Sequence, residues 1–158
     1  LPAHRKMFGI TLTRGAVGCA LSHLEAWEHA AKAKGPTLIL EDDIEVRDLR
    51  TLPARMKDVP QDWDVLYLGS GQYVKAPPGR GSQAQQKAAA RGVHLVQHAF
   101  QTIGYVVHPR SAAKLRGVLP LSVQVDGALQ ELPLVKYVLE PNLVVPRRDM
   151  HSDIQIMD

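Results

Sequence analysis

The stretch LILEDDIE, residues 38–45, joins a run of apolar side chains to three adjacent carboxylates. The apolar part has no polar alternation, which predicts a short strand buried on both faces of a sheet. Before it, apolar residues recur at helical spacings of three, four and seven between residues 15 and 35, and Gly35-Pro36 follows. This pattern predicts a helix that ends where the strand begins.

Further strands and helices are expected on both sides of a long polar segment. Strand-like runs are DWDVLYLGS (62–70), VHLVQHA (93–99), TIGYVVH (102–108) and VKYVLE (135–140), with short helices predicted near Pro109 and over 126–132. The segment 69–92 is rich in Gly, Pro, Ser, Gln and Ala and predicts a long mobile loop. Alternating strands and helices indicate an α/β fold with a mainly parallel sheet flanked by helices.

The composition indicates one soluble domain over residues 1–158. A hydrophobic fraction of 45% and a charged fraction of 22% are ordinary for a globular protein. The net charge of +3 and the scarcity of aromatic residues beside the basic ones argue against nucleic-acid binding. The single cysteine, Cys19, is interpreted as excluding an internal disulfide and any cysteine-based zinc cluster.

Glu41, Asp42 and Asp43 follow the predicted strand directly, where open α/β sheets bind ligands. If the backbone stays extended, Glu41 and Asp43 project to one side and Asp42 to the other. Neighbouring carboxylates raise one another's pKa values, and a hard cation such as Mg²⁺ or Mn²⁺ relieves the repulsion. The alternative interpretation is a solvated helix cap, since acidic residues favour helix N-termini.

A phosphoacceptor signalling domain also carries paired acids after a strand, but this chain does not fit that pattern. Such a domain needs a further Asp at the end of its third strand, and residues 65–125 contain no Asp. Asp64 begins a predicted strand rather than ending one, and a full helix precedes the acidic motif.

Four segments in the same order carry a resemblance to a known family. LTRGAVGCALSHLEAWEHA (12–30), LILEDDIE (38–45), DWDVLYLG (62–69) and IGYVVHPRSAAKL (103–115) together resemble glycosyltransferase family 25. That family contains bacterial lipooligosaccharide β-galactosyltransferases and collagen galactosyltransferases. Weaker similarities are VDGALQE and HSDI further along the chain.

The resemblance implies a GT-A-like (Rossmann-like) fold and an inverting, metal-assisted transfer of galactose from UDP-galactose. The cofactor would be Mn²⁺ or Mg²⁺, since a cation stabilises the diphosphate that leaves the sugar. The acceptor would be a glycan, a lipooligosaccharide or hydroxylysine, with lipopolysaccharide biosynthesis as one setting.

The same resemblance assigns roles to individual residues. Glu41, Asp42 and Asp43 occupy the place of the acidic metal motif, with Asp43 as the direct ligand, and His151 would complete the metal shell. Asp126 would be the base that deprotonates the acceptor hydroxyl, although Asp before Gly-Ala-Leu is also a reasonable helix cap.

Donor contacts are predicted for two pairs of residues that match the family. Ser22 and His23 lie on the first helix, where the histidine could also be packed in the core. Gly104-Tyr105 would let the backbone pass close to donor or acceptor, or mark a bulge in the strand. Cys19 is expected to be a small buried hydrophobe without an activated thiolate.

The chain departs from the family in two places. The family usually has Glu where this chain has Ala16, in a GE-x-GC motif. Family members also open with a strand and an arginine-bearing turn, and this chain is expected to begin after that first strand. These departures favour, as an alternative, a non-catalytic transferase-like domain that binds a nucleotide or a glycan.

Neither a membrane span nor a signal-peptide core is visible in the sequence. Together with the single cysteine, this predicts a cytoplasmic location, either free or at the inner face of the membrane. The acceptor, the linkage and the oligomeric state have no signature in the sequence.

Overall fold

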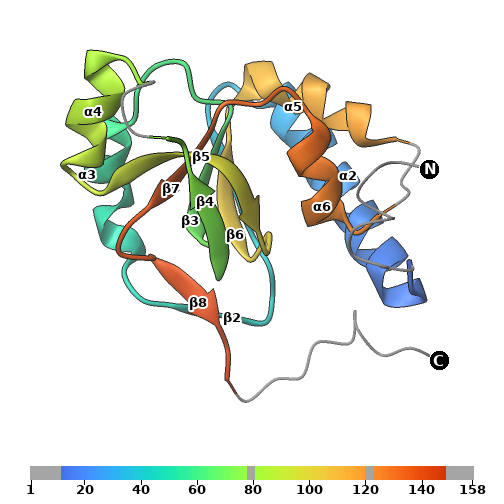
Figure 1. Cartoon of the computed structure of the whole chain (residues 1–158). Helices are drawn as coiled ribbons and strands as arrows, with labels where there is room; N and C mark the ends of the chain where they lie inside the picture. The colour runs from blue at the N-terminus through green and yellow to red at the C-terminus, as the bar shows by residue number, and fades with distance from the viewer. Residues whose placement is uncertain (1–11, 78–80, 120–122, 149–158) are drawn as a thin grey trace.

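A computed structural model describes residues 12–77, 81–119 and 123–148, and within these ranges its centre is a six-stranded sheet (Figure 1). The strand order is β1-β6-β3-β7-β5-β4. The strands are β1 (Thr37–Leu40), β3 (Val65–Gly69), β4 (Gln72–Lys75), β5 (Val93–Phe100), β6 (Gly104–Val107) and β7 (Lys136–Leu139).

The α/β class is confirmed: the central sheet is mixed, with four strands in one direction and two reversed, and helices cover both of its faces. Strands β1, β3 and β7 run in one direction, and β3 pairs with β7 in parallel. Strand β6 lies antiparallel between β1 and β3, and β5 lies antiparallel beside β7. The periodicity of a strand records its burial and not its direction, so the sequence pattern did not reveal these two reversals.

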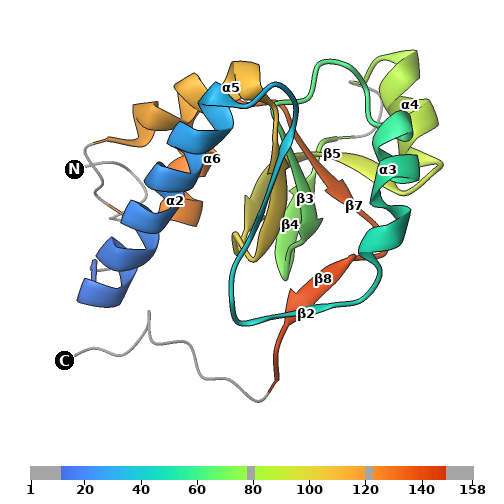
Figure 2. The same ribbon diagram turned by 180° about the vertical axis from the view of Figure 1, so that it is seen from behind.

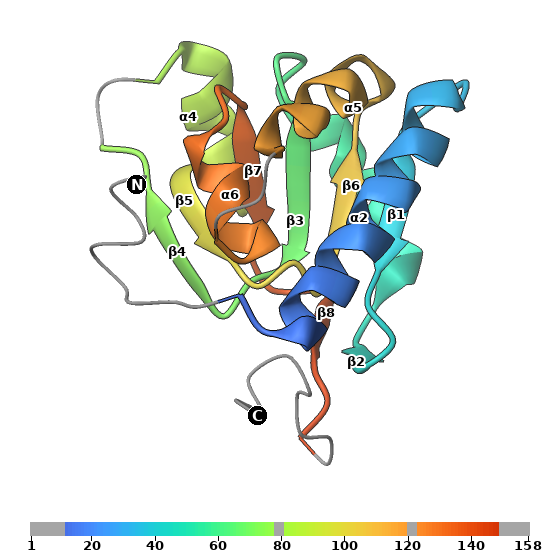
Figure 3. The same cartoon turned by 90° about the vertical axis from the view of Figure 1, so that its right-hand side faces the viewer.

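Helix α2 (Arg14–Lys32) confirms the first predicted helix and covers one face of the sheet together with α5 (Pro109–Leu115) and α6 (Val125–Glu131) (Figure 3). Its N-cap is Thr13, whose hydroxyl accepts a hydrogen bond from the Ala16 amide at 3.1 Å. The face turned to the sheet buries Ala16, Ala20, His23, Trp27 and Ala30. The small residues in this stripe allow the helix to lie close to the strands.

Strand β3 separates the two halves of the core, because its successive side chains point to opposite faces. Val65 and Tyr67 belong to the buried cluster under α2, α5 and α6. Leu66 and Leu68 belong to the cluster on the other face, which α3 (Leu52–Arg55) and α4 (Gln83–Ala89) cover. The short 3₁₀ turns Leu49–Thr51 and Met56–Asp58 flank α3, and a third, Arg116–Val118, follows α5.

Strand β1 differs from its prediction, because it forms one edge of the sheet and is not buried on both faces. Its burial alternates, and Leu38 and Leu40 keep 39% and 38% of their surface exposed. The edge position leaves the residues after Leu40 beside the start of β6, where the Glu41 amide donates to the Ile103 carbonyl at 3.0 Å.

The segment 69–92 was predicted to be a long loop, and the structure corrects this. It contains β4, which pairs with β5, and the two-turn helix α4. Helix α4 begins with a capping box, in which Ser82 accepts from the Gln85 amide and the Gln85 side chain accepts from the Ser82 amide. Ala88 is the one residue of this helix that is buried, so the sequence of the helix shows almost no pattern of large apolar residues.

A small second sheet lies past the ends of the main strands, at the bottom of the view in Figure 2. Strand β2 (Ile44–Val46) pairs antiparallel with β8 (Val144–Pro146). This pairing ties the segment after the acidic motif to the segment after β7, and the Arg147 amide donates to the Asp43 carbonyl at 2.9 Å. In the described ranges, no helix combines the length and the apolar character that a membrane span requires.

Candidate functional site

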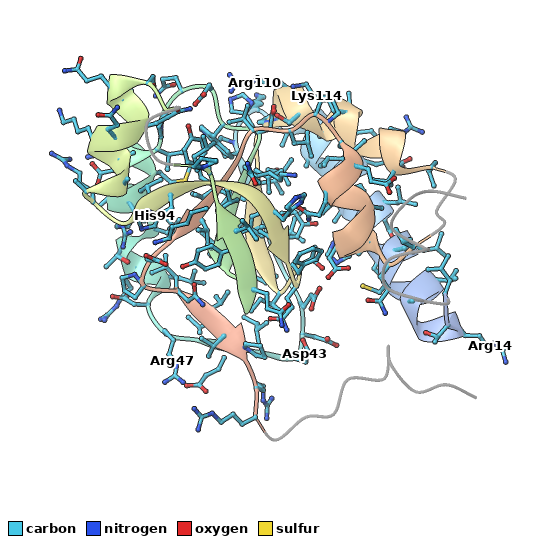
Figure 4. All side chains as sticks on the ribbon, in the orientation of Figure 1. Arg14, Asp43, Arg47, His94, Arg110 and Lys114 are labelled. Carbon is cyan, nitrogen blue, oxygen red and sulfur yellow. The ribbon has the colours of Figure 1, made fainter. Side chains whose placement is uncertain are left out.

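A cavity of about 180 Å³ lies where α2, α6 and the segments that follow β1 and precede β6 meet. Three of the acidic residues predicted from the sequence, Glu41, Asp43 and Asp126, line it. The remaining lining residues are Ala16, Cys19, Gln101, Thr102, Ile103, Gln124, Val125 and Pro146. Figure 4 shows Asp43 at the lower end of the sheet, between β8 and the N-terminal part of α2. The cavity therefore brings together carboxylates that are far apart in the sequence.

Glu41 is held in the cavity wall by two side chains. The Thr102 hydroxyl donates to Glu41 Oε1 at 2.8 Å, and His23 Nε2 lies 3.3 Å from the same oxygen. Burial disfavours the ionised carboxylate, but these two contacts more than offset it, and the pKa of Glu41 lies below its ordinary value. Glu41 is therefore an anion with a fixed orientation at neutral pH.

Glu41 and Asp43 face the cavity, while Asp42 is exposed and does not line it, although Asp42 and Asp43 lie in a turn and not in the extended backbone on which the prediction depended. Asp43 Oδ1 is buried and has no hydrogen-bond partner among the described residues. Burial, and then the charges of Glu41 and Asp42, raise the pKa of Asp43. A buried carboxylate oxygen without a partner is costly, and a bound cation would relieve that cost.

His23 lies behind the cavity wall in a hydrogen-bonded chain and has only 4% of its surface exposed. Its Nδ1 lies 2.7 Å from the Tyr105 hydroxyl, which accepts a hydrogen bond from Trp27 Nε1 at 2.8 Å. Burial raises the pKa of Tyr105 well above its ordinary value, so the phenol stays protonated. His23 was predicted to contact the donor, and the Gly104-Tyr105 backbone to pass close to donor or acceptor. Neither the His23 nor the Tyr105 side chain lines the cavity, and His23 contacts Glu41, which does.

Asp126 occupies the first turn of α6, one residue after the helix begins, and Gln124 is the N-cap. Its Oδ1 accepts from the Gly127 amide at 2.7 Å, and its Oδ2 accepts from the Gln101 amide at 3.2 Å. A carboxylate oxygen can accept a second hydrogen bond, so both oxygens remain able to bind a ligand. The two amides fix the direction in which Asp126 faces the cavity.

Two other predicted site residues, Ser22 and Gly104, do not line the cavity. Ser22 is exposed and bonds back to the Gly18 carbonyl at 3.2 Å. Gly104 faces the small sheet, where a Cβ atom would lie 2.6 Å from Val144 Cγ2, so packing explains this glycine. His151 lies outside the described residues.

Gln101 and Thr102 are site residues for which the sequence offers no signal. Gln101 adopts a φ of +69°, a conformation that non-glycine residues rarely take. Its side-chain oxygen accepts from the Gly71 amide at 2.9 Å while its own amide holds Asp126. Only the fold places this turn, between β5 and β6, next to the acidic motif.

Cys19 was expected to be a buried hydrophobe, and it is half-buried with its side chain at the cavity. Burial, and then the charges of Glu41, Asp126 and Asp43, raise the pKa of its thiol to about 11. The thiol is therefore not a free thiolate at neutral pH, as predicted, but it faces the site.

Comparison with known proteins finds a family match that covers most of the chain. The family described as "Glycosyltransferase family 25 (LPS biosynthesis protein)" matches residues 2–128. Procollagen galactosyltransferase 2 of Mus musculus is 33% identical over 130 residues, which are 76% of this chain and 20% of the relative. Procollagen galactosyltransferase 1 of Danio rerio is 29% identical over 158 residues, 91% of this chain and 24% of the relative.

A third relative is named as an inactive member of the family. "Inactive glycosyltransferase 25 family member 3" of Mus musculus is 30% identical over 131 residues, which are 77% of this chain and 21% of the relative. This chain thus spans between a fifth and a quarter of the length of these relatives.

Proposed function

Because this chain belongs to glycosyltransferase family 25, we propose that its cavity binds a nucleotide-sugar donor and transfers the sugar to an acceptor hydroxyl with inversion. UDP-galactose is the expected donor, since two of the relatives described above are named galactosyltransferases. The observation that carries the proposal is the convergence of Glu41, Asp43 and Asp126 on one cavity. A metal site and a catalytic base are the two acidic functions that such a transfer needs.

Glu41 and Asp43 are the proposed holders of a Mn²⁺ or Mg²⁺ ion. The unpartnered, buried Oδ1 of Asp43 fits this role, and within the described residues the hydrogen bonds to Glu41 all fall on Oε1. Carboxylate oxygens are the ligands that these hard cations prefer. A bound cation would balance the charge of the departing diphosphate. Asp42 and His151 stay predicted contributors to this shell.

Asp126 is the proposed base. Its carboxylate is fixed by two backbone amides and faces the same cavity as Asp43. It would take the proton of the acceptor hydroxyl as that oxygen attacks the anomeric carbon, and the proton would end on a carboxylate oxygen. The backbone amides of Gln101 and Gly127 would keep this carboxylate facing the acceptor hydroxyl.

The acceptor is proposed as a hydroxyl of a glycan, a lipooligosaccharide or hydroxylysine. The family description names lipopolysaccharide biosynthesis and the relatives' names include procollagen, so acceptors of both classes should be tested. A cytoplasmic location, free or at the inner face of the membrane, stays a prediction.

A second candidate function is nucleotide or glycan binding without transfer. Ala16 lines the cavity where the family usually carries Glu, so one carboxylate is missing from the wall. One of the relatives described above is named inactive. Measurement of binding and turnover on the same protein separates this candidate from the transferase.

The test is calorimetric titration of UDP and UDP-galactose into the chain, in Mn²⁺ and in EDTA. Binding is expected in Mn²⁺ and should weaken at least about tenfold in EDTA and in Asp43→Asn, because Asp43 is the proposed ligand. Glu45→Gln, an exposed acid outside the cavity wall, is the matched control and should bind like the wild type. Equal affinity in EDTA and in Asp43→Asn would contradict the cation site, and no binding under any condition would contradict the donor class.

Turnover is then measured as UDP release in the presence of each acceptor class. Release that depends on acceptor and on Mn²⁺ supports the transferase. Metal-dependent binding with no release from any acceptor supports the binding-domain alternative.

A further inference from the structure

Three unlike ligand groups meet at the inner wall of the cavity. The sulfur of Cys19, a ring nitrogen of His23 and a carboxylate oxygen of Glu41 all lie within 4.8 Å of one another. We propose that these three side chains form a binding site for a zinc-type cation, distinct from the Mn²⁺ or Mg²⁺ site at Asp43 and sharing Glu41 with it. This proposal stands on the cluster itself and does not require the proposed transfer reaction.

The two rigid elements that carry these side chains explain why they converge. Cys19 and His23 are four residues apart on α2, so they lie on one face, one turn apart. Glu41 follows β1 directly, and its amide is bonded to Ile103. Sites built on a helix and at a strand end hold their ligands more accurately than sites on loops.

The outer contacts of the cluster resemble those that accompany metal ligands in proteins. The Tyr105 hydroxyl holds His23 Nδ1 at 2.7 Å, which turns Nε2 toward Glu41 at 3.3 Å. Thr102 holds Glu41 Oε1 at 2.8 Å. Metal-ligating histidines and carboxylates commonly have such second hydrogen bonds, which fix the ring and the carboxylate.

The spacing suits a tetrahedral ion after a small closure. With bond lengths of about 2.0–2.3 Å, the ligand atoms of zinc lie roughly 3.3–3.8 Å apart. The His23–Glu41 distance of 3.3 Å already meets this value, and the cluster's upper limit of 4.8 Å requires a movement of about 1 Å. Cys19 and Glu41 both line the cavity, so an ion can enter from it and keep its fourth position open toward it.

The donor set distinguishes this ion from Mg²⁺ or Mn²⁺. Thiolate and imidazole favour zinc and related transition metals, whereas hard cations favour carboxylate and water. Binding would form a metal–sulfur bond and release the thiol proton of Cys19 to solvent, while His23 would bind through Nε2 as a neutral imidazole with its one ring proton on Nδ1, toward the Tyr105 hydroxyl. Because Glu41 belongs to both sites, the zinc-type ion would compete with the hard cation for it.

The first experiment uses Co²⁺ as a spectroscopic substitute for zinc on the untagged wild-type chain. Titration is expected to produce a thiolate-to-cobalt charge-transfer absorption in the near ultraviolet, which added Zn²⁺ removes and excess Mg²⁺ does not. Cys19→Ser should lose this band and bind Zn²⁺ at least about tenfold more weakly. His29→Gln is the matched control, since His29 is exposed on the same helix and lies outside the cluster.

A second measurement needs no variant in the cluster. The chain has one cysteine, so the rate of alkylation reports on Cys19 alone. Zn²⁺ should slow this rate at least about tenfold, and Mg²⁺ should leave it unchanged. A Co²⁺ complex without the sulfur band, an alkylation rate that Zn²⁺ does not alter, or Zn²⁺ binding that depends on His151 and not on Cys19 would each overturn the proposal. None of these readouts involves a nucleotide, so their failure leaves the proposed transfer untouched.

Discussion

Asp64, just before β3, and Asp43, shortly after β1, are two carboxylates whose surroundings differ in kind. Asp64 precedes β3, has 2% of its surface exposed and has both oxygens in use. Its Oδ1 accepts from the Ser111 hydroxyl and from Lys114, and its Oδ2 accepts from the Val135 amide at 2.9 Å. It therefore joins β3, α5 and the start of β7 into one structure.

Asp43, by contrast, has a buried oxygen without a partner among the described residues, and its carboxylate neighbours are Glu41 and Asp42. The pKa shifts of the two groups have opposite signs: that of Asp64 is lowered and that of Asp43 is raised. A buried charge whose partners are all present stabilises the fold, whereas one whose partners are missing marks a place for a ligand. This contrast distinguishes structural acids from site acids more clearly than the presence of an acidic motif does.

The largest effect is expected from Asp126→Asn in the transfer reaction. Removal of the proposed base should lower kcat about 1000-fold, because general base catalysis contributes roughly 10²–10⁴. Asn keeps only one of the two hydrogen bonds that Asp126 accepts from the Gln101 and Gly127 amides, so the melting temperature should fall modestly while the protein stays folded. The measurement is UDP release with acceptor, and calorimetry on the same variant should show unchanged UDP affinity. A kcat within about threefold of the wild type would remove Asp126 from the proposed mechanism.

Asp64→Ala should destabilise the fold without a direct effect on the cavity. The substitution leaves the Val135 amide and the Ser111 hydroxyl unpaired, and we expect a loss of about 3 kcal/mol in the free energy of unfolding. The measurement is denaturant unfolding, with Glu25→Ala, an exposed residue on α2, as the control within about 0.5 kcal/mol. The folded fraction should still bind Mn²⁺ and UDP. If Asp64→Ala instead lost binding at unchanged stability, Asp64 would be a site residue and not a structural one.

Most of the fold could be predicted because most of its elements bury long apolar stretches. Helix α2 and strands β3, β5, β6 and β7 all carry clear hydrophobic patterns and were predicted within a few residues. Helix α4 was missed because it buries little beyond Ala88, although Ser82 and Gln85 carried a capping-box signal. Strand directions depend on long-range pairing, which local periodicity does not contain.

The residues alone pointed to the site where the sequence concentrates charge, and Asp126 was predicted from the family resemblance. The three adjacent acids drew attention to the end of β1, but a turn at Asp42 and Asp43, and not an extended strand, separates Asp42 from the two acids that line the cavity. The role of His23 could not be read in the same way, because its partner Tyr105 is 82 residues away. Thr102 and Gln101 have ordinary side chains and acquire their roles from a turn that only the fold defines.

The pH dependence of stability should show the two acids acting in opposite directions. For Asp64, burial disfavours the charge, but Ser111, the Val135 amide and Lys114 lower the pKa below its ordinary value of 3.8. The unfolded chain therefore binds the proton more readily, and stability is lost as the pH falls through the folded pKa. The raised pKa of Asp43 means that its ionisation opposes folding as the pH rises. Unfolding curves between about pH 3 and pH 7 check both, with Asp64→Asn flattening the acid limb.

The smallest effect is expected from Asp43→Asn, which should raise stability and weaken cation binding. Asp43→Asn removes a charge that burial and the neighbouring carboxylates disfavour, so the metal-free protein should gain roughly 0.5–1 kcal/mol in unfolding free energy. The gain should shrink in Mn²⁺, since the wild type then acquires binding energy that the variant lacks. Glu45→Gln, in an exposed pair with Arg47, should change stability little in either condition. A loss of stability for Asp43→Asn in EDTA would mean that Asp43 is a structural acid like Asp64. A gain in EDTA that is reversed in Mn²⁺ would identify Asp43 as a cation ligand.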